Sequence, residues 1–374
     1  MPRSTTKPTA ARDDLLLAAR YELANGAYEQ VGLRQVAARA GIDTAKLVRE
    51  FGSKEQLLIE VMDAVLPGPS MRLAPTWVDD FAGELTGAAR PDLTEPFRIL
   101  AFSAPSPAVE GIVRARVHAL LGPLEGALDG GEARGVRAAL AAAVIFGVIL
   151  SRDVIGLEPP GGRQICAPFV VELLSSLRSS GAERKPRGGP PAAPAEPRPF
   201  GVAETKAAIL EAADQAFSEL GYEHASVRRI AAAAGIDPAL IVRYFGSKEE
   251  LFQEVLRLHF AGPARPDVAL STALAALADL KDGGAPLDIT LRSAPSPIAR
   301  KILKQDIETR FLSRLAEYGD DDKADVRALM HSAVFMGASF CHSILRVPAL
   351  HEFRGEALER LTALLTLTWT TKTW

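Results

Sequence analysis

The sequence contains one short stretch twice, as AGIDTAKLVREFGSKEQL at residues 40–57 and as AGIDPALIVRYFGSKEEL at residues 234–251. Thirteen of the eighteen aligned positions are identical, at a constant offset of 194 residues. In each copy an alanine-rich segment (33–40 and 227–234) precedes the glycine, and another short apolar segment follows it. Two short helices joined by a tight glycine turn are the sequence form of a helix-turn-helix.

Capping residues stand where these helices should begin. Asp43 and Asp237 precede the second helix of the motif, and Pro238 occupies the first helical position, which tolerates proline. Ser53 and Ser247 open a further helix, with Gln or Glu three residues later, which is capping-box spacing. The stretch therefore predicts two consecutive helix starts in each copy.

The repeat extends beyond this motif to nearly the whole chain. Upstream, residues 15–41 align with 208–235. Downstream the offset changes to 190, with SAPSP at 103–107 and 293–297, and VRAALAAAVIFG at 136–147 matching VRALMHSAVFMG at 326–337. A unit of about 180 residues is a duplicated domain pair rather than a solenoid repeat. Between the copies, residues 179–201 are rich in proline, glycine and charge, which predicts a linker that could span roughly 60 Å.

Composition and patterning predict a soluble, all-α, cytoplasmic protein. Hydrophobic residues make up 48% of the 374 positions and no segment alternates between apolar and polar residues, so no sheet is expected. Cys166 and Cys341 cannot form a disulfide framework. The longest apolar run, 140–150, is too short to cross a bilayer, and the first residues lack a secretory signal, so no membrane association is expected. The net charge of −3 does not itself favour nucleic acid.

The helix-turn-helix nevertheless predicts binding to double-stranded DNA, because its second helix fits the major groove. Lysines in the first turn of the next helix lie where backbone N–H groups already favour phosphate. The candidate DNA-binding residues are Arg34, Thr44, Lys46, Arg49 and Lys54 in the first copy, and Ser226, Arg228, Pro238, Leu240, Arg243, Tyr244 and Lys248 in the second.

The motif resembles the DNA-binding domain of the TetR family of transcriptional regulators. The resemblance rests on Ile-Ala-x-x-Ala-Gly-Ile-Asp (Val36 replaces the first isoleucine in copy 1), then seven residues, then Phe-Gly-Ser-Lys-Glu-x-Leu. It covers about 50 residues in each copy. It implies a three-helix DNA-binding domain followed by a larger helical domain that dimerises and binds a small-molecule effector. Members of the family bind an operator as two-fold dimers and release it when the effector binds.

Both copies depart from the family pattern. The first helix of the motif is commonly capped by serine or threonine; the second copy has Ser226, but the first has Gly32. A tyrosine is common in the middle of the recognition helix, where both copies have valine. Two residues later, where an aromatic residue or histidine is common, the second copy has Tyr244 and the first has Glu50. Copy 1 is thus expected either to bind weakly or to read a different half-site with Lys46 and Arg49.

The duplication and the resemblance together define the domains. The helix-turn-helix DNA-binding domains are residues 10–66 and 202–260. The helical effector and dimerisation domains are residues 67–178 and 261–374, and the linker is residues 179–201. The last two helices of each copy should form a four-helix bundle. Aromatic and methionine side chains are candidate effector contacts, although core packing is the alternative for each: Trp77, Phe97, Phe102, Phe146, Met330, Phe335, Met336 and Phe340.

No catalytic site is evident from the residues. Nothing resembles a nucleophile–base pair, a phosphate loop or a paired-carboxylate site, so no enzyme and no cofactor is predicted. His331, Cys341 and His342 share a predicted helix, but their spacing does not close a metal site.

The sequence thus predicts a transcriptional regulator, specifically a repressor, whose two copies replace the subunits of a homodimer. As a monomeric pseudo-dimer it should recognise an imperfect palindrome, and pairing between two chains is the competing arrangement. The alternative function is a ligand- or partner-binding protein on the same scaffold that has lost or reduced DNA binding in one or both copies.

Overall fold

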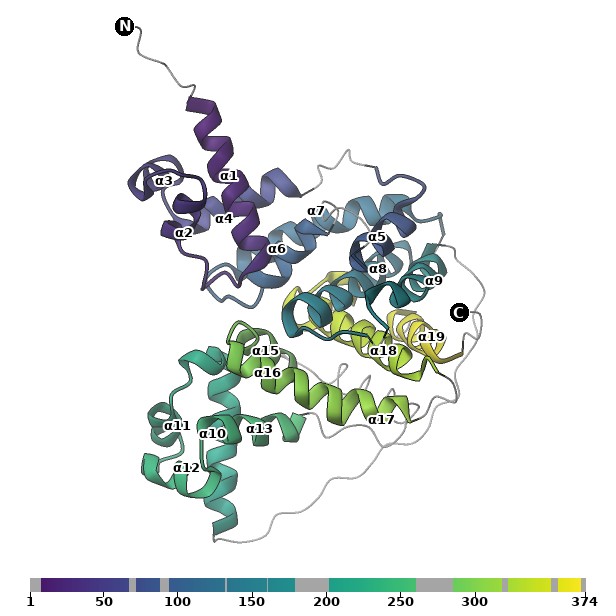
Figure 1. Ribbon diagram of the computed structural model, residues 1–374. Coiled ribbons are helices and arrows are strands. Elements are labelled where there is room, and N and C mark those ends of the chain that lie inside the picture. The colour runs from purple at the N-terminus through teal and green to yellow at the C-terminus, as the bar shows by residue number, and fades with distance from the viewer. Residues whose placement is uncertain are drawn as a thin grey trace, which may run out of the picture. The chain divides into compact units, whose positions relative to one another are not determined.

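The computed structural model is helical, and no strand occurs in the part of the chain that it describes (Figure 1). This confirms the predicted all-α class. The described residues are 8–66, 72–87, 94–131, 133–159, 161–178, 202–259, 285–317, 322–350 and 356–370. The predicted linker, 179–201, lies outside them.

Each copy contributes a similar order of helices. Those of the first copy are α1 (Pro8–Asn25), α2 (Leu33–Arg39), α3 (Thr44–Phe51), α4 (Lys54–Val65), α5 (Trp77–Leu85), α6 (Glu95–Ser103), α7 (Glu110–Ala127), α8 (Arg134–Ile149), the π-helical turn η1 (Leu150–Ile155), the 3₁₀ turn η2 (Arg163–Cys166) and α9 (Ala167–Arg178). Those of the second are α10 (Val202–His224), α11 (Val227–Ala233), α12 (Pro238–Phe245), α13 (Lys248–His259), α15 (Ala285–Ser293), α16 (Pro297–Asp306), η3 (Ile307–Leu312), α17 (Ser313–Ala316), α18 (Ala324–Ser339), η4 (Phe340–Ile344), η5 (Pro348–Leu350) and α19 (Glu356–Thr370).

The chain divides into two compact units, and the division does not fall between the copies. Unit 1 is Met1–Ala127 and contains α1 to α7; unit 2 is Leu128–Trp374. The last two helices of the first copy, α8 and α9, therefore belong to the same compact unit as the second copy.

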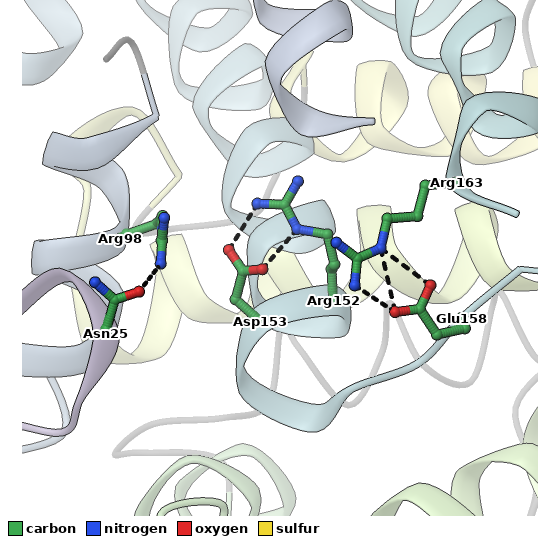
Figure 2. A network of polar contacts seen from close by, with 6 residues as sticks. All are labelled: Asn25, Arg98, Arg152, Asp153, Glu158 and Arg163. Atoms are coloured by element: carbon green, nitrogen blue, oxygen red, sulfur yellow. Dashed lines mark hydrogen bonds and ion pairs between the residues drawn. The ribbon is translucent and has the colours of Figure 1, made fainter. Parts of the chain in front are cut away.

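In unit 1, α1 is the helix against which α2, α4 and α6 pack. Its buried face consists of small and aliphatic residues at helical spacing, including Leu15, Ala19 and Leu23. Beyond its end, the backbone N–H of Tyr28 donates to the carbonyl of Phe102 at 3.1 Å, and the Arg98 side chain of α6 bonds to Asn25 (Figure 2). These bonds hold the first head, residues 8–65, to α6.

The second head, residues 202–259, is anchored within unit 2 through the equivalent tyrosine, with a different acceptor. Gly221 interrupts α10 with φ of 70°, which glycine adopts without strain. Its Cα lies so close to the carbonyl of Arg292 that a Cβ there would overlap that oxygen. The N–H of Tyr222 then donates to Ser293 Oγ at 3.0 Å, at the end of α15.

The centre of unit 2 is a four-helix bundle made from both copies. Helix α8 lies along α18, α9 packs on α8 and on α19, and α19 packs on α18 (Figure 1). The bundle predicted from the family resemblance is thus present within one chain. Phe146 of α8 meets Phe340, just beyond α18, with ring centroids 5.0 Å apart.

Two glycines set the approach of α8 to α18. A Cβ on Gly147 would overlap the carbonyl oxygen of Ala333, and a Cβ on Gly337 would overlap that of Ala143. The two contacts are reciprocal, as expected for two related helices that cross about a pseudo-two-fold axis.

Polar contacts hold the first copy's last helix in place. The fully buried guanidinium of Arg137 donates to the carbonyls of Leu177, Arg178 and Asp129 at 3.2, 2.8 and 2.7 Å. It therefore satisfies carbonyls at the end of α9, which have no partner within the helix.

Two local ion pairs shape the connection between α8 and α9, as Figure 2 shows. Arg152 pairs with its neighbour Asp153 at 2.6 Å, and Arg163 binds Glu158 in a forked contact. The bond from Arg163 lowers the pKa of Glu158 and raises that of Arg163 itself.

One helical segment, Arg134–Ile155, has the length and apolarity of a membrane span. In the structure 89% of its most apolar window is buried inside the protein, so these side chains already have an apolar environment in the bundle.

Candidate DNA-binding site

The helix-turn-helix of the first copy is formed by α2 and α3. Gly41 adopts φ of 65° in the turn, and the N–H of Ile42 donates to Ala37 at 2.9 Å. Asp43 caps α3 by accepting from the N–H of Ala45 at 2.7 Å. The predicted turn and cap are both confirmed.

The second copy repeats this geometry in α11 and α12. Gly235 has φ of 68°, and Asp237 accepts from the N–H of Ala239 at 2.7 Å. Ser226 also caps α11 through the N–H of Arg229, whereas Gly32 gives α2 no side-chain cap. The difference in capping noted in the sequence is therefore present in the folded chain.

The exposed face of each recognition helix, α3 and α12, carries both charged and apolar side chains. In α3 the apolar Leu47 and Phe51 are buried; in α12 Ile241 is. Among the predicted DNA-binding residues of the two helix-turn-helices, the exposed ones are Arg34, Lys46, Arg49, Ser226, Arg228 and Arg243, and the part-buried ones are Thr44, Pro238, Leu240 and Tyr244. Each of these residues is thus at least partly accessible to solvent in its head.

Two exposed valines also belong to this face. Val48 is 41% exposed and Val242 is 56% exposed, at equivalent positions. Apolar side chains at such positions contact thymine methyl groups in the major groove. In the sequence these valines appeared only as departures from the family pattern. That their side chains are exposed on the recognition helices is visible only in the structure.

The predicted phosphate-binding lysines open α4 and α13, but each is folded over a tyrosine. Lys54 Nζ lies 4.0 Å from the centroid of the Tyr28 ring and donates to the Tyr28 carbonyl. Lys248 Nζ lies 4.2 Å from the Tyr222 ring. Burial lowers the pKa of both lysines. Their contact with phosphate remains a prediction.

The same tyrosines bind a carboxylate on the following helix. Tyr28 donates to Glu55 at 3.3 Å, and Tyr222 donates to Glu249 at 2.8 Å. Burial, followed by the nearby glutamate, raises the pKa of each phenol. This tyrosine–lysine–glutamate group occurs in both heads and was not singled out in the sequence, because its members lie 26 and 27 residues apart.

Glu50 is not a free acid on the recognition helix. Its Oε1 lies 3.1 Å from Nε of Arg12, on α1, and the same guanidinium pairs with Glu60. The carboxylate that the sequence places against the DNA backbone is therefore paired within head 1, with a guanidinium that it shares with Glu60.

The candidate effector residues fall into separate surroundings. In unit 1, Trp77 and Phe97 flank Phe81 in edge-to-face contacts at 6.3 and 5.6 Å, and Phe102 is part-buried. In unit 2, Phe146 and Phe340 meet within the bundle, Met330 is buried, and Phe335 and Met336 are part-buried. Effector contact by any of them stays a prediction. No cluster of metal-binding side chains occurs among the residues described.

Comparisons with known proteins match the chain twice in the same order. The family profile for bacterial regulatory proteins of the tetR family matches residues 15–61 and 209–255, and the profile for a tetracyclin repressor-like C-terminal domain matches 80–164 and 268–365.

Relatives and a solved structure match parts of the chain. The HTH-type transcriptional repressor Rv3405c of Mycobacterium tuberculosis and the HTH-type transcriptional regulator Mb3439c of Mycobacterium bovis are each 41% identical over 66 residues, or 18% of this chain and 35% of the relative. The match thus spans about a third of those relatives. A crystal structure of NalD, the secondary repressor of the MexAB-OprM multidrug efflux pump in Pseudomonas aeruginosa, is 21% identical, covers 46% of this chain and 100% of its own, and gives a TM-score of 0.33. The profile matches, which follow one another twice along most of the sequence, show that the chain belongs to the TetR family of bacterial regulatory proteins and holds two tandem copies.

Proposed function

We propose that the chain is a cytoplasmic, sequence-specific DNA-binding transcriptional repressor with two non-identical reading heads. The observation that carries this proposal is the outer face of each recognition helix. Both helices are fixed by an aspartate cap and a buried apolar side, and both turn an arginine and a valine outward at equivalent positions, Arg49 with Val48 and Arg243 with Val242.

The heads should read different half-sites. Lys46 in head 1 corresponds to Leu240 in head 2, and Thr44 corresponds to Pro238. A basic side chain suits the acceptors of guanine, whereas apolar side chains suit thymine methyl groups. An imperfect palindrome is the operator that fits such a pair.

A small-molecule effector that releases the repressor from DNA is part of the same proposal, as is the absence of enzymatic activity. Both come from the family to which the chain belongs. The effector domains proposed are residues 67–178 and 261–374, with the candidate contacts named above.

A second candidate function is a ligand- or partner-binding protein with weakened DNA binding. Two observations favour it: residues 1–66 carry nine Lys or Arg against nine Asp or Glu, and the recognition helix of head 1 carries Glu50. A nucleic-acid binder usually has a broad basic surface.

Selection of duplexes from a random DNA pool tests the first candidate against the second. A repressor should enrich an imperfect palindrome, and its affinity should fall steeply between about 50 mM and about 200 mM salt because bound cations are released from the phosphates. Arg243→Ala should weaken binding to the enriched duplex by about tenfold or more if the side chain contacts a guanine.

The matched control is Lys301→Ala, which removes an exposed lysine from α16, outside both heads. It should leave affinity unchanged. A pool in which no sequence is enriched at either salt concentration would contradict the repressor and favour the second candidate.

A further inference from the structure

One pair of equivalent positions couples the first helix of each head to its recognition helix. In head 1 the pair is Arg12 and Glu50, joined by the ion pair at 3.1 Å. The Arg12 guanidinium also pairs with Glu60 of α4 and lies 5.2 Å from the centroid of the Phe51 ring. The Arg12 guanidinium thus has two carboxylate partners and an aromatic ring within head 1.

The equivalent pair in head 2 has the opposite character. Arg12 corresponds to Lys206 and Glu50 to Tyr244, at the common offset of 194. Lys206 Nζ lies 5.9 Å from the centroid of the Tyr244 ring. The second carboxylate of head 1, Glu60, is conserved in position as Glu254, but Glu254 pairs with Arg257 on its own helix.

Among the described residues, Lys206 is therefore a cation that no carboxylate pairs with. Its side chain is exposed, and within the described part of the chain it joins no ion pair. A tyrosine ring attracts an ammonium without neutralising it. The three groups Arg12, Glu50 and Glu60 sum to one negative charge in head 1, whereas the equivalent Lys206, Tyr244 and Glu254 sum to zero in head 2.

Double-stranded DNA carries one negative charge per about 1.7 Å of helix axis, so a cation beside a recognition helix neutralises a phosphate when it has no other partner. An arginine that already satisfies two carboxylates gains little from phosphate, because it must first break those pairs.

We propose that Lys206 is a phosphate-contacting residue of head 2, and that Glu50 keeps the equivalent Arg12 of head 1 away from DNA by pairing with it. The residue at position 50 or 244 of the recognition helix thereby decides whether the cation on the first helix of that head is available to a DNA phosphate. This inference rests on the proposed DNA-binding function.

The salt dependence of binding to the duplex recovered from the random pool tests the proposal. Each phosphate contact contributes about −0.9 to the slope of log K against log salt. Lys206→Ala should reduce the magnitude of the slope by about 1, and Arg12→Ala should leave it unchanged. Lys301→Ala on α16 is the control for loss of a lysine outside the heads.

A gain of contact in head 1 is the converse test. Glu50→Tyr with Glu60→Gln frees Arg12 from both carboxylates and should increase the magnitude of the slope by about 1. The same two changes made together with Arg12→Ala should not increase it, which separates release of Arg12 from loss of acidic charge. Glu50→Gln replaces Glu50→Tyr if the ring prevents folding, as thermal melting of each variant will show.

The outcomes separate this inference from the function on which it rests. If the unmodified chain binds no duplex at any salt concentration, the repressor proposal fails. If the chain binds DNA but Lys206→Ala keeps the full slope, or Arg12→Ala lowers it as much as Lys206→Ala does, only the present inference is overturned.

Discussion

Several single side chains in this protein have partners that the linear sequence hides. Arg12 and Glu50 lie 38 positions apart in the sequence, and Lys54 meets Tyr28 across 26 positions. The charges of Arg12, Glu50 and Lys54 were visible in the sequence. Their partners depend on how α1, α3 and α4 pack, which local patterns do not specify. The sequence thus showed which residues carry charge, but not which of them pair with one another.

The lysines that open α4 and α13 show the consequence for mutagenesis. Because Lys248 packs over Tyr222, replacing it by alanine removes both a charge and a packing contact. A loss of DNA affinity in that variant mixes two effects. Lys248→Met keeps most of the side-chain stem and is the better probe of the charge alone.

His331 gives a prediction at the level of one titrating group. It is buried on α18, bonds to the backbone of Leu365 on α19, and burial lowers its pKa to about 4. The unfolded chain, with an ordinary histidine pKa near about 6.5, takes up a proton first as pH falls. The free energy of unfolding should therefore decrease between about pH 6.5 and about pH 4, by up to about 3 kcal/mol from this group.

Urea unfolding at a series of pH values measures this loss. His331→Gln should flatten the dependence over that interval, whereas His224→Gln, a substitution of an exposed histidine in the second head, should preserve it. An unchanged pH profile in His331→Gln would show that other groups cause the acid sensitivity.

At the scale of helices, two of the four bundle helices, α8 and α18, were predictable because their composition is unusual. The segments around 136–154 and 326–346 are apolar on all sides, which indicates burial rather than a single core-facing stripe. Their continuation as π-helical turns, η1 and η4, was not predicted, since such turns depend on tertiary packing. Helices α5 to α7 also had no individual prediction, because their segments carry weaker start signals.

The close approach of α8 and α18 yields a prediction about one methyl group. In Gly337→Ala the new Cβ meets the backbone carbonyl of Ala143, which cannot rotate away, so the helices must separate. Overpacking of this kind should lower the free energy of unfolding by about 1 to 3 kcal/mol.

Gly111→Ala is the matched control, because Gly111 is exposed on α7 with open space around its Cα. There alanine should stabilise the helix, by up to about 1 kcal/mol. Equal effects of the two substitutions in urea unfolding would contradict a backbone contact between α8 and α18.

At the scale of the whole chain, the division into compact units bears on how the copies assemble. Helices α8 and α9 of the first copy group with the second copy rather than with their own head. In a homodimer these helices would need a partner from another polypeptide, whereas here α18 and α19 of the same chain occupy that place. The two heads of such a chain can differ in sequence, because they are no longer two copies of one polypeptide.

The last prediction is that the free protein is a single chain and that its operator has unequal half-sites. The sequence of the linker allows a reach of roughly 60 Å, which exceeds the 34–36 Å between half-sites one helical turn apart. A tether also keeps the partner domain at an effective concentration of order mM, so pairing within the chain should outcompete pairing between chains.

Light scattering at micromolar concentration should give a mass near 39.9 kDa. Exchanging Leu240 for lysine, the residue at the equivalent position of head 1, should then make the selected half-sites more alike, because recognition by each head follows its own side chains. A stable two-chain mass would contradict the internal pairing, since four heads would then be available and the selected sites should be longer or doubled.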